Sequence, residues 1–266
     1  MKPYNTLTLL DVLCIALTLC VTLSLLRNSN CYRAASSSTR WLSITGVFCL
    51  AEYYLAWAHW YQTSETIPSI LIVTLSVALI SGKFVQNRIL AGALLVLLGF
   101  IQGFIRADVA VILHAGFFLA VLFSPKAPIP LGRIRQLAVS LFTALVAGCV
   151  QLYLMRIRFP NAKYGPEGVV QFAVNLHPGM WLTMLLALSP YWLLISLIAT
   201  RRYQPNTSTR MLLTASVLYL AVWTVVGLLD EVRIFLPFAF ALIPATVMAL
   251  IGRIPESNRS YRSRAV

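Results

Sequence analysis

Long apolar runs recur along this chain, and short basic loops separate them. A helix of about 20 apolar residues is long enough to cross the roughly 30 Å hydrocarbon core of a bilayer. Only 11% of the residues are charged, whereas a soluble domain carries about 25%. We therefore predict an all-α, polytopic transmembrane bundle with nine spans, at residues 7–26, 41–61, 67–82, 89–105, 109–123, 137–155, 178–199, 211–229 and 234–252.

The nine runs predict one transmembrane domain over residues 1–252, followed by a basic cytoplasmic tail over residues 253–266. The first run has the position of a signal peptide, but it is long and no small-residue cleavage site follows it. Arg27, Arg33 and Arg40 follow it instead, which is typical of a retained span with a cytoplasmic loop behind it.

Basic residues predict the orientation of the chain. With the N-terminus outside, the inner loops and the tail hold fifteen of the 21 lysines and arginines. Cytoplasmic loops of membrane proteins carry an excess of these residues, so the pattern favours an N-out, C-in protein of the bacterial inner (plasma) membrane. Seven of the eight acidic residues fall in the outer half, and Glu256 is the exception. The outer face therefore mixes both signs of charge.

The net charge of +13 would suggest nucleic-acid binding in a soluble protein. Here the basic residues are spread through the loops without interleaved aromatic residues, and contact with anionic lipid headgroups explains them. We expect membrane lipids as partners, and no nucleic acid. The five cysteines lack the spacing of a metal or redox site, so we expect no metal or other cofactor.

Glu52 and His59 lie seven residues apart in the second span and share a helical face. Glu52 would lie about 13 Å inward from Tyr61, and a carboxylate at that depth should face the bundle interior or a wet cavity. The two residues form either a proton-transfer pair or a structural pair bonded to neighbouring spans. His114, in the fifth span, gains functional interest only if it meets one of them.

Arg106 lies at the outer end of the fourth span, two residues before Asp108 in a very tight turn. Its guanidinium can clamp a phosphate or carboxylate bidentately, or it can pair with Asp108 and close the turn. Gly92, Gly99 and Gly103 form a stripe on the same span. Glycines four residues apart let two helices approach closely, so we expect this stripe to serve packing.

Two further outer segments carry charge. Arg156 and Arg158 follow the sixth span, where they suit a lipid-linked phosphate or form part of an ordinary solvated loop. Asp230, Glu231 and Arg233 interrupt a long apolar stretch. Glu231 and Arg233 can pair across the turn, or the two acids can form a site for a general base or proton relay.

The segment Glu231-Val232-Arg233-Ile234-Phe235-Leu236-Pro237, followed by Pro244, resembles the last-span motif Glu-x-Arg-x-Phe-x-Pro of uncharacterised bacterial multi-span inner-membrane proteins. The resemblance covers the final quarter of the chain and the start of the seventh span at Asn175-Leu176-His177-Pro178. Some of these proteins resemble compact relatives of the membrane-embedded polyprenyl-phosphate-sugar glycosyltransferases. That family implies an outer-face active site with paired acids in the first outer loop, where this chain has only Glu65.

Three functions follow from these patterns. The first is action on a lipid-linked envelope glycan, such as a polyprenyl-phosphate-linked sugar, or on a related lipid phosphate at the outer face. Its acid/base candidates are Glu52, His59, Asp230 and Glu231, and its substrate-binding candidates are Arg106, Arg156, Arg158, His177 and Arg233. Their side chains should converge on one outward-opening cavity.

The second function is a small proton-coupled transporter that uses Glu52, His59 and His114 as a relay, with broken helices around a central site. The third is a non-catalytic membrane subunit of an envelope-assembly complex. In that case the glycine stripe of the fourth span would be an exposed binding face.

Overall fold

The computed structural model describes residues 4–60, 65–123, 129, 131–161, 171–229 and 231–251, without the side chains of residues 4–8, 59 and 60. Every regular element within these ranges is a helix. The elements are α1 (Tyr4–Arg27), α2 (Asn30–Ala34), α3 (Ser37–Trp60), α4 (Thr66–Ile80), α5 (Arg88–Phe123), α6 (Arg133–Tyr153), the π-helix η1 (Leu154–Arg158), α7 (Phe172–Asn175), α8 (Pro178–Ala187), α9 (Ser189–Ala199), α10 (Thr207–Val226), the 3₁₀-helix η2 (Val232–Ile234), α11 (Leu236–Ala241) and α12 (Ile243–Ile251).

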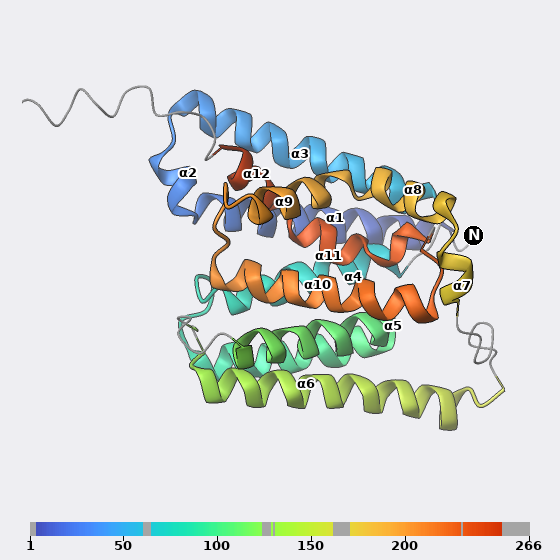
Figure 1. Cartoon of the computed structure of the whole chain (residues 1–266). Helices are drawn as coiled ribbons and strands as arrows, with labels where there is room; N and C mark the ends of the chain where they lie inside the picture. The colour runs from blue at the N-terminus through green and yellow to red at the C-terminus, as the bar shows by residue number, and fades with distance from the viewer. Residues whose placement is uncertain are drawn as a thin grey trace, which may run out of the picture.

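The long helices lie side by side and run between two ends of one bundle (Figure 1). We name these the α2 end and the α7 end, after the short helix that each holds. In the described part of the chain, four helices are long and apolar enough to cross a membrane: α1 from Leu9, α5, α6 with η1, and α10. The α8–α9 pair is a fifth candidate, bent by 84°. The described part of the chain is all-helical, and the length and composition of these helices indicate a membrane protein.

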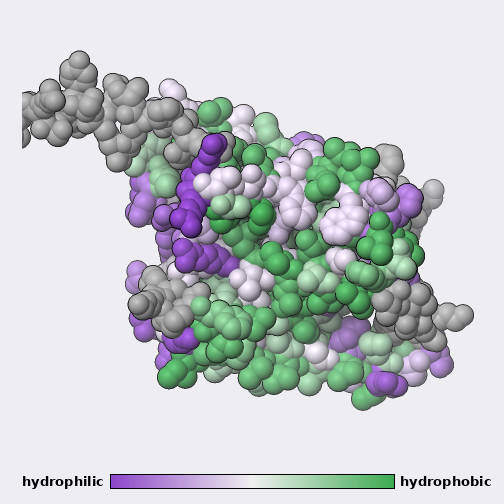
Figure 2. Space-filling model, viewed as in Figure 1, coloured by the Kyte–Doolittle hydropathy of each residue, from purple (hydrophilic) through white to green (hydrophobic). Residues whose placement is uncertain are grey.

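The exterior of the bundle is apolar between its two ends. Hydrophobic residues cover much of the middle of the face seen in Figure 2, and hydrophilic residues gather towards its two edges. Large side chains on α6 are between 51% and 84% exposed, namely Ile134, Leu141, Phe142, Leu145 and Leu152. Such a continuous apolar surface is costly in water and matches the hydrocarbon of a bilayer.

Helix α5 is a hairpin whose two halves lie against each other. Arg106 has non-helical dihedral angles, φ −148° and ψ 81°, and breaks the helix. A Cβ atom at Gly99 would lie 3.5 Å from His114 Nε2, although fifteen residues of straight helix would separate these positions by about 22 Å. The tight turn predicted between residues 105 and 109 is therefore present.

The glycine stripe packs the first half of this hairpin against α6. A methyl group at Gly99 would collide with Thr143 Cγ2, and one at Gly103 would lie 3.1 Å from Val150 Cβ. Gly92 is buried with the other two glycines. The predicted packing role is confirmed. The exposed binding face that we expected of a non-catalytic subunit is wrong, because α6 covers the stripe.

The last apolar run forms the centre of the bundle. All six residues of α11 and all but the last two residues of α12 are buried. These short helices pack against α4, α3, α1 and α9. The run predicted as a span over residues 234–252 is broken at Leu242, just before Pro244. Because Pro244 has no N–H group, the backbone cannot continue one regular helix through it.

A proline also explains the bend between α8 and α9, which divides the predicted span 178–199. Pro190 lacks an N–H group, so the Leu186 carbonyl four residues earlier loses its helical donor. The Tyr53 hydroxyl of α3 donates to this carbonyl and lies 3.2 Å from Ser189 Oγ. A neighbouring helix therefore satisfies the break, as a bilayer requires.

Substitution of Gly99 by alanine tests the close packing of α5 on α6. The new methyl group would collide with Thr143, whose rotamer is fixed because its Oγ1 donates to the Val139 carbonyl at 2.7 Å. We expect Gly99→Ala to lower the free energy of unfolding by roughly 1–3 kcal/mol, measured by thermal denaturation in detergent micelles. Gly148→Ala is the matched control, because no atom lies within 4 Å of the added methyl group. Equal stability of the two variants would contradict this packing.

Candidate functional site

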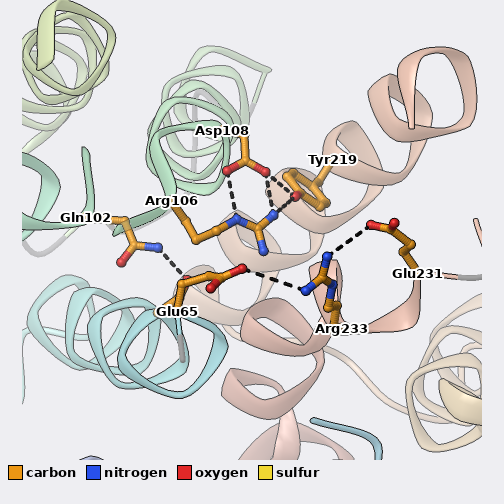
Figure 3. Close-up of polar contacts among 8 residues, drawn as sticks. Glu65, Gln102, Arg106, Asp108, Tyr219, Glu231 and Arg233 are labelled. Atoms are coloured by element: carbon orange, nitrogen blue, oxygen red, sulfur yellow. Dashed lines mark hydrogen bonds and ion pairs between the residues drawn. The ribbon is translucent and has the colours of Figure 1, made fainter. Parts of the chain in front are cut away.

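Five charged side chains and one tyrosine, from four separate parts of the chain, meet at the α7 end, and Figure 3 shows their contacts. One comes from the residue before α4, two from the turn of the α5 hairpin, one from α10 and two from η2 and the residue before it. We name this group the charged cluster; its members are Glu65, Arg106, Asp108, Tyr219, Glu231 and Arg233.

Arg106 and Asp108 form a bidentate ion pair across the turn of the hairpin. Arg106 Nε donates to Asp108 Oδ1 at 3.0 Å, and Nη2 donates to Oδ2 at 2.6 Å. Two parallel bonds of this kind fix the orientation of both groups. The two side chains are 11% and 31% exposed. Of our two interpretations of Arg106, the pair that closes the turn is confirmed.

Tyr219 attaches this ion pair to the aromatic core. Its hydroxyl accepts from Arg106 Nη2 at 2.8 Å and donates to Asp108 Oδ2 at 2.6 Å. Its ring stacks on Trp223, with centroids 5.7 Å apart, and meets the edge of Phe235 at 5.4 Å. The hydroxyl therefore cannot leave the pair without disturbing rings on two elements.

Arg233 forms a second, looser ion system beside the first. Its Nη1 lies 3.8 Å from Glu65 Oε1, and its Nη2 lies 3.6 Å from Glu231 Oε2. The Arg233 side chain is 25% exposed, and each of the two glutamate side chains is 39% exposed. Val232 and Ile234 of η2 are buried, which directs Arg233 between them towards the surface. Hydrogen-bonded ion pairs are shorter, about 2.7–2.9 Å.

The two ion systems act on each other. The Glu65 carboxylate that pairs with Arg233 also attracts the Arg106 guanidinium, and Figure 3 shows both guanidiniums near this carboxylate. Among the described residues the cluster holds three carboxylates and two guanidiniums. Its formal charge is therefore negative by one unit.

Two buried amides hold the elements that carry the cluster. Gln102 Nε2 donates to Ser69 Oγ and joins α5 to α4 one turn inward from Arg106. Asn175 Nδ2 donates to the Gly227 carbonyl at 2.6 Å, and its Oδ1 accepts from the Leu229 backbone at 3.0 Å. Asn175, which is part of the family resemblance, therefore positions the backbone that leads to Glu231.

Asp108 also lines a hollow of about 440 Å³ between the second half of α5 and the end of α6. The other lining residues are mostly apolar: Ala107, Val111, Ile112, Gly148, Gln151 and Leu152. Leu152 is 60% exposed, so the hollow opens on the apolar exterior. A lipid chain lying there would reach one edge of the charged cluster.

The structure brings together three of the predicted site residues, Arg106, Glu231 and Arg233. The expectation that Glu52 faces the bundle interior is wrong. Helix α3 turns Ala51 and Tyr54 into the core, which leaves Glu52 between them exposed. His114 is 1% exposed within the α5 hairpin, so it does not form a relay with Glu52. The His59 side chain lies outside the described residues.

Among the described residues, none of the ion pairs of the cluster involves Arg156, Arg158 or His177. Arg156 and Arg158 are exposed on η1. His177 is exposed as well, and its Nδ1 accepts from the Gly179 backbone at 3.2 Å, which caps α8. Asp230 lies outside the described residues. The structure therefore joins Arg106, Glu231 and Arg233 in one group of ion pairs, and Glu52, Arg156, Arg158 and His177 are exposed side chains outside these pairs.

Sequence reasoning missed part of the cluster. Glu65 was named only as the single acid of the first outer loop, and Tyr219 did not stand out within its apolar run. The position of Glu65 in the sequence could have indicated its role. Glu65 and Glu231 each lie just before an apolar run that enters the bundle from the α7 end, so both carboxylates reach the same end. Tyr219 carried no comparable signal, since its role depends on which helix lies beside the hairpin turn.

Comparison of the chain with protein-family models, curated proteins and solved structures finds no match. The geometry therefore defines the site: a bidentate Arg–Asp pair locked by a tyrosine, beside an arginine shared by two half-exposed glutamates. This arrangement lies at one end of a helical membrane protein.

Substitution of each arginine by glutamine should separate the two ion systems. Arg106→Gln leaves Asp108, a mostly buried carboxylate, without its cation, so we expect a loss of roughly 3–5 kcal/mol in the free energy of unfolding. Arg233→Gln removes two long ion pairs to partly exposed glutamates and should cost less than about 1 kcal/mol. Thermal denaturation in detergent measures both. The double variant Arg106→Gln/Asp108→Asn should recover part of the stability that Arg106→Gln loses, because it also removes the unpaired carboxylate. Equal losses of stability in Arg106→Gln and Arg233→Gln would contradict the proposed difference between the two ion systems.

Proposed function

We propose that this chain is a nine-span inner-membrane protein with its N-terminus outside and its C-terminus inside. The α5 hairpin supports counting residues 88–123 as two spans, and the satisfied break at Leu186 supports counting α8 and α9 as one. The distribution of cations supports a cytoplasmic α2 end. Ten described lysines and arginines lie near that end: Arg27, Arg33, Arg40, Lys83, Arg88, Arg133, Arg135, Arg201, Arg202 and Arg210.

In this orientation the charged cluster is the outer-face site of the protein. There the protein acts on a lipid-linked envelope glycan or a related lipid phosphate. The observation that carries the proposal is the convergence of Arg106, Glu231 and Arg233 at one end of the bundle, with Glu65 as a further carboxylate. The resemblance of Glu231–Pro237 to the last-span motif of uncharacterised bacterial multi-span inner-membrane proteins is in line with this location.

Arg233 is the group that binds the phosphate. Its ion pairs of 3.6 and 3.8 Å join partly exposed groups, and pairs of this kind contribute little stability. A phosphate can replace one carboxylate and form shorter, bidentate bonds to the guanidinium. Arg106 has a different role, because Asp108 and Tyr219 already bind three of its five N–H donors. It positions the turn that borders the site.

Glu65 and Glu231 are the acid/base candidates of this site. A carboxylate displaced from Arg233 by phosphate stays beside the bound group, where it can exchange a proton with the substrate. Both carboxylates are 39% exposed and are therefore reachable from the aqueous side. Glu52 and His177 have no part in this proposal, because neither takes part in the ion pairs of the cluster.

The hollow beside Asp108 supports a lipid as the substrate carrier. It is apolar along most of its length and opens towards the exterior that faces hydrocarbon. A chain lying in this hollow would place its headgroup at the α7 end, within the layer where the cluster lies. Pockets that combine an apolar wall with a few polar groups are typical of ligand sites.

The proposed orientation predicts the location of the C-terminus. A fluorescent protein that folds only in the cytoplasm should be active when fused after residue 266, and an alkaline phosphatase fused there should be inactive. A phosphatase fused within the loop between α6 and α7 should be active. Reversed activities would overturn the orientation and the outer location of the cluster together.

Arg233→Gln should abolish function while leaving the protein abundant. In cells whose own copy is replaced by the variant, we expect at least a tenfold loss of the dependent lipid-linked glycan pool, because a bidentate charge-assisted contact is lost. Arg158→Gln is the matched control, since Arg158 is exposed near the same end but outside the cluster. Glu231→Gln should behave like Arg233→Gln. An unchanged glycan pool at normal abundance in both cluster variants would contradict the proposed function.

A further inference from the structure

A second cavity lies at the opposite, α2 end of the bundle. It has a volume of about 440 Å³ and lies among the ends of α1 and α4, the start of α10, and α12. It contains none of the residues of the charged cluster. We name it the α2-end cavity.

The rim of the α2-end cavity is polar and its floor is apolar. Lys83, Gln204 and Asn206 line the rim and are exposed, so the cavity opens to the surface. Leu212 and Ala245 line the floor and are 1% and 3% exposed. A ligand that fills this cavity must therefore carry a polar head and an apolar chain.

The charge around the cavity has one sign. Lys83 lines the rim, and further arginines lie at the same end of the bundle. All five carboxylates of the described residues lie elsewhere. Glu65, Asp108 and Glu231 belong to the charged cluster, Asp11 lies in the half of α1 nearer the α7 end, and Glu52 lies in the corresponding half of α3. The head of a matching ligand is therefore anionic.

Lys83 is held at the rim in a position that suits an anion. Its Nζ donates to the Asn28 carbonyl at the end of α1, which fixes one of its three donors. Burial, and then the nearby charge of Arg33, lower the pKa of Lys83 below its ordinary value. Two cations that repel each other without a carboxylate between them would both be stabilised by a bound anion.

The break in the central helix forms part of the floor. Leu242 and Pro244, where α11 gives way to α12, both line the cavity. A chain resting there would pack against the segment of the core that cannot form one continuous helix. A ligand in the cavity should therefore stabilise the folded bundle, because it binds the native state and not the unfolded chain.

We propose that the α2-end cavity binds an anionic phospholipid, with its phosphate at Lys83 and an acyl chain along the floor formed by Leu212 and Ala245. A soluble anion would leave the apolar floor empty, and a neutral lipid would leave the cations without a counter-charge. The proposal does not depend on the function of the charged cluster.

Thermal denaturation of the purified protein in neutral detergent tests this proposal. Phosphatidylglycerol should raise the midpoint of unfolding in a saturable way, whereas phosphatidylcholine with the same acyl chains should not. Lys83→Gln should weaken the apparent affinity for phosphatidylglycerol by roughly tenfold, and Lys83→Arg should retain it. Arg88→Gln is the matched control, because Arg88 is an exposed cation at the same end that does not line the cavity.

The measured quantity is the shift in unfolding midpoint that the lipid causes, so a variant that is simply less stable does not affect the result. Equal shifts with both lipids, or no shift with either, would overturn the proposal. An equal loss of affinity in Arg88→Gln would indicate attraction to the whole basic face and would also overturn it. A full shift with inorganic phosphate or glycerol 3-phosphate would assign the cavity to a free anion in place of a lipid.

Discussion

A helix that breaks inside a bilayer exposes carbonyl and amide groups where no water can bind them. This chain breaks several of its helices, and side chains from elsewhere in the sequence bond at three of these breaks. Tyr53 of α3 donates to the carbonyl that Pro190 leaves without its donor. Asn175 binds the backbone beyond the end of α10. At the α5 break, the Tyr219 hydroxyl of α10 bonds to both members of the Arg106–Asp108 ion pair. The order of the bundle depends on these long-range bonds, because apolar contact alone does not distinguish one helix from another in lipid.

The need to satisfy polar groups inside a bilayer also explains the position of the charged cluster. The α5 hairpin, the end of α10 and η2 all reach the α7 end, so their polar groups meet there and satisfy one another. Tyr219 links the ion pair of the hairpin to the rings of the core. Close packing of α5 on α6 through Gly99 and Gly103 sets the position of the hairpin turn. A functional site at this end therefore rests on elements that are fixed for structural reasons.

The length and spacing of the apolar runs predicted most of the helices, because membrane thickness limits helix length directly. The tight turn at Arg106 and the packing role of the glycine stripe were also predictable, since both depend on local sequence. It was harder to predict which face of a helix points into the bundle. Glu52 has the depth of an interior carboxylate, but α3 lies at the edge of the bundle and turns Ala51 and Tyr54 inward instead. Tyr219 was missed for the converse reason, because its partner lies 111 residues away in sequence. Periodicity describes one helix and does not identify its neighbour.

The two ends of the bundle differ in how an anion can bind. At the α7 end, Arg233 already interacts with Glu65 and Glu231, so an incoming phosphate must displace a carboxylate. That exchange makes binding weak and reversible, and it leaves a proton-accepting group beside the ligand, which suits turnover. At the α2 end, the described residues place cations around a cavity without a carboxylate. An anion there displaces no competing charge and gains an apolar floor, which suits a ligand that stays bound. A substrate site and a structural lipid site therefore require opposite charge arrangements, and this chain has one arrangement at each end.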